Sequence, residues 1–214
     1  MKRRNFLQKA SLSTIGVVAS TSVVACNANK EKNNSGSIVN STRVKPIVIA
    51  TWNVPNATAK AWEVINNGGT SLDAVEQGCM IEEADVKNSS VGKGGLPDRD
   101  GNVTLDACIM DKDGNYGAVM CVQNITHVIS LARKVMEETP HVILAGEGAE
   151  NFGYDLGFKK ENLLTESSKK AWEKWKVTSN YKPIINIENH DTIGMLAIDL
   201  NGDISGACTT SGLS

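Results

Sequence analysis

The sequence lacks the signatures of several common protein classes. No two of the five cysteines are separated by only two residues, and the three histidines form no ligand cluster with them. We therefore predict neither a zinc site nor a site for another metal or a cofactor. Aromatic residues make up only 5% of the chain. The mildly apolar stretch at residues 10–25 is too short and too polar for a membrane-spanning helix.

The chain also has little excess charge. The formal net charge is −2, and four of the 22 basic residues are Lys2, Arg3, Arg4 and Lys9. Without these four, 18 basic residues face 24 acidic ones, a net charge of about −6. No basic patch remains, so we do not expect nucleic acid as a partner.

Residues 1–25 are typical of a bacterial export signal. Lys2-Arg3-Arg4-Asn5-Phe6 resembles a twin-arginine motif, and the apolar stretch that follows ends in Val23-Val24-Ala25-Cys26, which resembles a lipoprotein box. We therefore expect a periplasmic protein anchored to a membrane by a lipid on Cys26. An ordinary cleaved signal with a chance cysteine is the alternative. Residues 26–44 are polar and predict a flexible tether.

The remaining residues predict one α+β domain of helices packed on antiparallel hairpins. Apolar periodicity and turn residues give the boundaries. The predicted strands are 46–52, 103–110, 116–122, 141–145, 193–200 and 203–210, and the predicted helices are 57–66, 129–138, 148–156, 165–177 and one capped by Thr70 or Ser71. The strand from Ile193 is apolar on both faces, so we expect it to lie between two layers.

Four cysteines lie in this domain, each in an apolar context: Cys79, Cys108, Cys121 and Cys208. A buried, small hydrophobic side chain is the expected role of each. A disulfide is compatible with an exported protein, but the sequence does not pair the cysteines.

The pair Asp191-Thr192 is the main candidate for chemistry. A polar linker leads to it, and an apolar strand begins directly after it. Cleavage of this bond would make Thr192 an N-terminal residue, which supplies a hydroxyl nucleophile and an amine base together. His190 and Asp191 adjoin the same bond and are candidates for assisting the cleavage. The alternative is a polar loop followed by an ordinary strand.

Several blocks of the chain resemble the glycosylasparaginases, also called aspartylglucosaminidases or N4-(β-N-acetylglucosaminyl)-L-asparaginases, and the flavobacterial type most of all. The resemblance runs from about Lys45 to Ser214. The matching blocks are Thr51-Trp52-Asn53, the glycine loop from Ser90 to Asp98, Thr104 to Asp111, Ala132 to Glu137, Asn189 to Met195 and Gly206 to Gly212.

The resemblance implies an N-terminal-nucleophile hydrolase with a four-layer αββα sandwich. It implies self-cleavage before Thr192, with residues 45–191 in the α chain and residues 192–214 at the start of the β chain. The implied substrate is a glycoasparagine, whose amide would be hydrolysed to aspartate and an amino-sugar. Thr192 would be the nucleophile and Thr210 its support, while Trp52 and Ser90 would line the site. The resemblance also implies a dimer of cleaved pairs.

Two departures from the family pattern stand out. The residues that hold the substrate's carboxylate and amine, and those of the oxyanion hole, follow Ser214 in the family, so the second sheet is incomplete here. We expect the sequence to be part of a longer, active enzyme. Lys93 also replaces a usual aromatic residue in the glycine loop.

Two other functions stay open. One is a related isoaspartyl peptidase/L-asparaginase with a threonine nucleophile, although members of that group usually carry Gly before the Thr, where this chain has Asp191. The other is an inactive, lipid-anchored remnant or binding protein.

Overall fold

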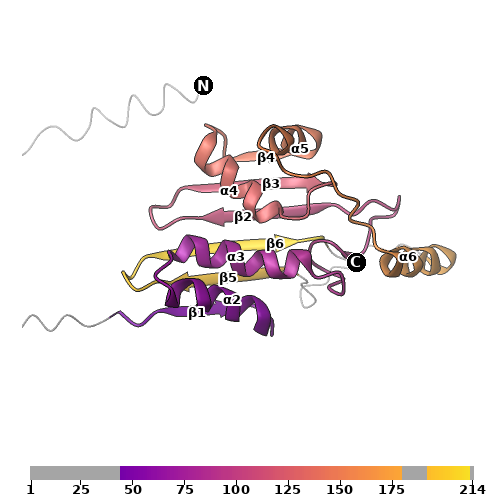
Figure 1. Cartoon of the computed structure of the whole chain (residues 1–214). Helices are drawn as coiled ribbons and strands as arrows, with labels where there is room; N and C mark the ends of the chain where they lie inside the picture. Colours follow the sequence, from indigo (N-terminus) through magenta and orange to yellow (C-terminus); the bar gives the residue numbers. More distant parts are fainter. Residues whose placement is uncertain (1–43, 180–191, 213–214) are drawn as a thin grey trace, which may run out of the picture. The chain divides into compact units, whose positions relative to one another are not determined.

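The computed structural model describes residues 44–179 and 192–212, in which six strands form one sheet (Figure 1). The strand order is β1-β5-β6-β2-β3-β4. All neighbours are antiparallel except β3 and β4, which are parallel. The strands are β1 (Ile47–Ala50), β2 (Leu105–Met110), β3 (Tyr116–Val122), β4 (Ile143–Ala145), β5 (Ile193–Ile198) and β6 (Ile204–Thr210).

The last two strands lie in the middle of this sheet, although they come last in the described chain (Figure 1). β5 pairs with β1 on one side and with β6 on the other, and β6 then pairs with β2. Strands near residue 200 are thereby held between strands near residues 50 and 105. The start of β5, where Thr192 lies, is consequently supported by both sides of the fold.

Helices cover one face of the sheet (Figure 1). The described helices are α2 (Pro55–Asn66), α3 (Ser71–Ala84), α4 (Val128–Glu138), α5 (Gly146–Asp155) and α6 (Glu166–Thr178). α3 contacts β5 and β6, and α4 contacts β2 and β3. β3 approaches α4 so closely that a Cβ on Gly117 would lie 2.2 Å from the carbonyl oxygen of Ala132. Among the described residues, no helix is both long and apolar enough to cross a membrane.

A capping box fixes the start of α3 at Thr70. The Thr70 side chain accepts a hydrogen bond from the Asp73 backbone, and the Asp73 side chain accepts one from the Thr70 backbone. Two of the N–H groups that a helix leaves unpaired at its start are satisfied in this way. Of the two caps that the sequence suggests, the structure uses Thr70.

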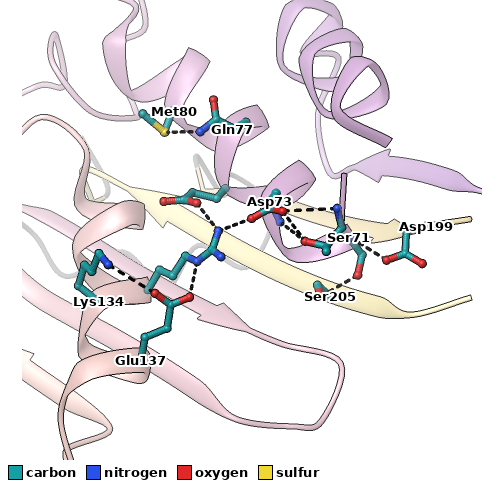
Figure 2. A network of polar contacts seen from close by, with 11 residues as sticks. Ser71, Asp73, Gln77, Met80, Lys134, Glu137, Asp199 and Ser205 are labelled. Atoms are coloured by element: carbon teal, nitrogen blue, oxygen red, sulfur yellow. Dashed lines mark hydrogen bonds and ion pairs between the residues drawn. The ribbon is translucent and has the colours of Figure 1, made fainter. Parts of the chain in front are cut away.

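An arginine joins α3 to α4. Nη1 of Arg133 donates to Asp73 at 2.7 Å and to Glu76 at 2.6 Å, and its Nε donates to Glu137 at 2.6 Å. Figure 2 shows Asp73 and Glu137 at the two ends of this network. One planar guanidinium thus holds carboxylates from both helices, which fixes how the two helices pack over the sheet.

Asp199 joins the end of β5 to the start of α3. Its Oδ2 accepts the backbone N–H of Ser71 at 3.0 Å, and its Oδ1 accepts those of Asn201 and Asp203 in the β5–β6 turn. Ser71 and Ser205 also share a hydroxyl hydrogen bond of 3.0 Å (Figure 2). Burial opposes ionisation of Asp199, but the donated N–H groups still keep its pKa below the ordinary value.

The opposite face of the sheet is apolar and uncovered within the described residues. β5 buries Ile193, Met195 and Ala197 under the helices, whereas Leu196 is exposed. The same face carries other exposed large side chains: Ile47, Ile49, Met110, Tyr116, Met120 and Ile204. Apolar surface of this kind is what a second sheet would cover.

The predicted α+β class is confirmed, and each predicted strand and helix is present with small shifts at its ends. The four-layer sandwich stays a prediction, as do the boundaries of the signal, the tether and the two chains. The signal, Cys26 and residues 27–43 of the tether lie outside the described residues.

Candidate active site

Two side chains at the end of β1 hold the backbone of Thr192. The indole Nε1 of Trp52 donates to the Thr192 carbonyl oxygen at 2.9 Å, and Thr51 Oγ1 donates to the same oxygen at 3.3 Å. Thr51 Oγ1 also accepts the N–H of Gly194 at 3.0 Å. The residue predicted as nucleophile therefore lies on backbone that is held by three hydrogen bonds from two side chains, at the point where β5 begins.

Thr210 lies on the neighbouring strand at the same level. Ile193 is the Cα partner of Thr209, so the register continued by one residue sets Thr192 level with Thr210. Side chains alternate between the faces of a strand. Ile193 and Thr209 face the helices, and Thr192 and Thr210 consequently share the uncovered face. The structure thus brings the predicted nucleophile and its predicted support together.

Ser90 approaches from the glycine loop. Its carbonyl oxygen accepts the N–H of Ser211 at 2.9 Å, directly after Thr210. Its own N–H and hydroxyl both donate to Asn88 Oδ1, at 3.0 and 3.1 Å. Ser90 is therefore ordered beside the end of β6.

Two glycines of the glycine loop, Gly92 and Gly95, lie too close to neighbouring residues to carry a Cβ atom. Gly92 has a φ of +66°, and a Cβ there would lie 2.2 Å from the carbonyl oxygen of Glu83. A Cβ on Gly95 would lie 2.4 Å from Ser211 Oγ. Only glycine allows this approach without strain, so the loop packs directly against α3 and the end of β6.

Lys93, which departs from the family pattern, has a partner in this structure. Its Nζ lies 2.8 Å from Glu161 Oε2, and both side chains are partly exposed. The hydrogen bond from Lys93 is the main cause that lowers the pKa of Glu161. The lysine thus ties the glycine loop to the segment before α6.

Asp106 is a neighbour of the site for which no role was predicted from the sequence. It is the Cα partner of Thr210, and its Oδ1 accepts the N–H of Cys121 at 2.8 Å. Cys121 has a φ of +55°, next to an irregularity in the pairing of β2 with β3. Asp106 therefore stabilises a bulge beside Thr210. In the sequence, the signal that could have indicated this role was the position of Asp106 within the matching block from Thr104 to Asp111.

Glu83 is a second residue that the sequence reasoning missed. It is completely buried, and its Oε1 accepts the N–H of Ile129 at 2.9 Å and the hydroxyl of Thr209 at 2.7 Å. Burial raises the pKa of Glu83, against the opposing effects of His127 and Thr209. His127 Nδ1 lies 3.4 Å from Oε2, an ion-pair distance without hydrogen-bond geometry. Glu83 thus anchors β6 one residue before Thr210.

The two residues predicted to assist cleavage, His190 and Asp191, lie outside the described residues. Within the described ranges, no three His, Cys, Asp or Glu side chains are grouped as metal ligands would be.

The expected burial of the cysteines is correct only for Cys79. Cys108, Cys121 and Cys208 are exposed. Cys108 and Cys208 occupy positions of β2 and β6 that point away from the helices. The apolar context of these cysteines reflects the apolar sheet face and not burial beneath the helices.

A shallow cavity of about 560 Å³ lies on the uncovered face, and Thr51 and Gly194 are among the residues that line it. Its remaining lining is mostly apolar, including Ile49, Met110 and Leu196. An apolar lining does not suit a substrate that carries a carboxylate, an amine and a sugar. We therefore assign the cavity to the sheet face and place the candidate site around Thr192, which is hydrogen-bonded to the lining residue Thr51.

Comparison with known proteins gives a consistent picture. The family model described as asparaginase matches residues 32–214. An N(4)-(β-N-acetylglucosaminyl)-L-asparaginase of Elizabethkingia miricola is 52% identical over 99% of this chain and 61% of its own length. A protein of the same name from Rattus norvegicus is 35% identical over 82% of the chain and 60% of its own length.

A third relative carries a different name. The isoaspartyl peptidase/L-asparaginase of Rattus norvegicus is 37% identical over 75% of this chain and 49% of its own length. The chain thus spans about half to three fifths of the curated relatives that it matches. Because the family model covers most of the sequence, the chain belongs to the asparaginase family.

Proposed function

We propose that the complete protein is an amidohydrolase that cleaves the amide between N-acetylglucosamine and the asparagine side chain. The observation that carries this proposal is the fixed backbone of Thr192, with Trp52, Thr51, Thr210 and Ser90 around it. Two relatives that carry the corresponding name match 99% and 82% of the chain. The products would be aspartate and an amino-sugar that loses ammonia.

The first step of the proposed chemistry is self-cleavage. The Thr192 hydroxyl attacks the carbonyl carbon of Asp191, and the peptide bond becomes an ester in an N-to-O acyl shift. Asp191 takes the hydroxyl proton in this proposal, while His190 orients the loop. This shift frees the Thr192 amine, and hydrolysis of the ester then frees the Thr192 hydroxyl and separates the two chains. Because Trp52 and Thr51 hold the carbonyl of Thr192, the backbone that carries the hydroxyl is held next to the bond that breaks.

The second step is substrate hydrolysis. The freed amine has an ordinary pKa of about 7.7–8.0, so it acts as a base near neutral pH. It takes the proton of the Thr192 hydroxyl, which attacks the amide carbonyl of the substrate. The amine returns the proton to the leaving amino-sugar, and water hydrolyses the aspartyl ester. Thr210 supports the nucleophile, and Trp52 and Ser90 line the site.

A second candidate activity is that of an isoaspartyl peptidase/L-asparaginase. The 37% identity to a rat protein of that name favours it. Both activities would use the same threonine nucleophile. Their substrates differ in the group that is attached to the amide nitrogen. Turnover of glycosylated asparagine against that of an isoaspartyl dipeptide and free asparagine therefore decides between them.

The deciding experiment uses the complete protein from its own gene. Denaturing mass spectrometry of the wild type is expected to show two chains, the second beginning at Thr192. Thr192→Ala should give one uncut chain without activity, and Thr192→Ser should retain cleavage because it keeps the hydroxyl. An uncut wild-type chain without turnover would leave the inactive remnant or binding protein in place of the enzyme.

The location and assembly of the protein are part of the same proposal. Export by the leader and lipidation at Cys26 would place the enzyme on the periplasmic side of a bacterial membrane. The cleaved α and β fragments would stay together, and two such pairs would form a dimer. Size measurement of the purified complete protein tests the dimer.

A further inference from the structure

Two cysteines face each other across adjacent central strands. Cys108 of β2 and Cys208 of β6 are Cα partners in the antiparallel pairing. Directly opposed residues in such a pair have Cα atoms about 4.5–5.5 Å apart. Disulfides form at Cα separations of about 4.4–6.8 Å. The backbone therefore meets the distance requirement for a bond between the two side chains without moving.

Both side chains lie on the sheet face that is uncovered within the described residues, and both are free thiols in this structure. A hydrogen bond from the Cys208 thiol lowers the pKa of Cys108 to about 6, although burial opposes this. The same contact raises the pKa of Cys208. A lowered pKa favours the thiolate form of Cys108, and the thiolate is the nucleophile in disulfide exchange.

The other two described cysteines do not compete for this pairing. Cys79 is buried on α3, on the helix side of the sheet, where burial raises its pKa. Cys121 lies on β3, where the residue opposite Cys108 is Ala118. The register therefore selects one pair among these four cysteines.

We propose that Cys108 and Cys208 are a redox site that closes to a disulfide between β2 and β6. The Cys108 thiolate attacks an oxidised disulfide such as oxidised glutathione and releases one thiolate. The Cys208 sulfur then attacks the Cys108 sulfur of the mixed disulfide, loses its proton and releases the second glutathione. Two protein thiols and one oxidised glutathione thus give one protein disulfide and two reduced glutathiones.

The disulfide would have a particular consequence in a self-cleaving protein. This part rests on the proposed function. Cys108 precedes the Asp191–Thr192 bond and Cys208 follows it, so cleavage puts the two cysteines in different chains. The disulfide would then join the α chain to the β chain covalently, beside Thr210.

The test uses the complete protein with Cys26→Ser, so that the lipidation cysteine takes no part. Thiols are blocked with N-ethylmaleimide, both as isolated and after equilibration with oxidised glutathione. Denaturing gels are run with and without reductant. We expect one joined species without reductant and two chains with it. Peptide mapping should find a linked pair of peptides that contain Cys108 and Cys208.

Variants identify the sulfurs. Cys108→Ser and Cys208→Ser should each abolish the joined species, and Cys121→Ser, the matched exposed cysteine, should retain it. Two separate wild-type chains without reductant, under both conditions, would overturn the proposal. One chain even with reductant would mean that self-cleavage fails. In that case the peptide mapping alone tests the disulfide. Absence of the linked peptides from the uncut chain would then overturn the proposal as well.

Discussion

The indole N–H of Trp52 donates a 2.9 Å hydrogen bond to the carbonyl oxygen of Thr192, across 140 residues of sequence. The bond joins the end of β1 to the start of β5, and the Trp52 side chain remains about half exposed. The family resemblance implied that Trp52 lines the site. Its described contact is instead with the backbone of the proposed nucleophile, which makes it a positioning residue as well as a candidate lining residue.

Trp52→Phe should slow both self-cleavage and substrate turnover. The variant keeps most of the ring but removes the N–H donor. One neutral hydrogen bond contributes about 1 kcal/mol, which corresponds to about a fivefold change in rate. A time course of chain cleavage and kcat on glycosylated asparagine measure the effect. Trp175→Phe is the control, because Trp175 is similarly exposed and has no described contact with Thr192. Equal rates for the two variants would contradict the positioning role.

Glu83→Gln should remove a pH dependence of stability. Burial raises the pKa of Glu83 above its ordinary value of 4.5. The contribution of Glu83 to the free energy of unfolding is therefore fully present below pH 4.5, where the folded and unfolded chains both hold the proton. It is lost as the pH rises through the pKa that Glu83 has in the folded state. Glutamine keeps the acceptor for Ile129 and Thr209 but does not ionise. Urea unfolding at about pH 5 and about pH 8 should show a smaller difference for the variant.

Two further variants complete this test. Glu83→Ala should destabilise the protein by about 1–3 kcal/mol, since it leaves a buried N–H and a buried hydroxyl unpaired. Glu173→Gln, at an exposed position of α6, should behave as the wild type. An unchanged pH slope in Glu83→Gln would show that Glu83 does not titrate as its burial implies.

Asp199→Asn should weaken the junction of α3 with the β5–β6 turn. The carboxylate accepts N–H groups of Ser71, Asn201 and Asp203, and its pKa is lowered from 3.8. Its stabilisation is present above 3.8 and is lost as the pH falls through the lower folded pKa. We expect a loss of about 1.5–3 kcal/mol near neutral pH, measured by urea unfolding. Asp113→Asn, in the exposed β2–β3 turn, should cost much less, and equal losses would refute the argument.

Cys26→Ser should move the complete protein from the membrane fraction to the soluble fraction. A thioether-linked lipid at Cys26 is the expected anchor, and serine does not accept it. Fractionation and the mass of the N-terminal peptide report the change. A wild-type N-terminal peptide without added lipid mass would leave the simple cleaved signal as the correct interpretation.

The strands and helices were predictable because their signals are local. The α3 segment has its cap at Thr70 and an apolar face that repeats with the helical period. The turn from Asp111 to Asn115 has the residues of a hairpin, and the structure places it between β2 and β3. The candidate nucleophile was predictable as well, since a polar linker, a threonine and an apolar strand are adjacent in the chain.

Contacts between distant segments were not predictable in this way. Glu83 follows Glu82 at the end of a helix, where acidic side chains are usually solvated, and only the packing of α4 and β6 buries it. Asp106 gains its role because β6 lies beside β2. The exposure of Cys108 and Cys208 depends on which sheet face the helices cover, a choice that local periodicity does not make.

By itself, the sequence determined the α+β class, the order of the elements and the presence of a threonine at the start of an apolar strand, because propensity, capping and periodicity act between near neighbours. Only the tertiary structure decided that β5 and β6 enter the centre of the sheet. That insertion places Thr192 against Trp52, Thr210 against Asp106, and Cys208 against Cys108. The physical reason is that strand order and register depend on burying a shared apolar face, which is a property of the whole chain.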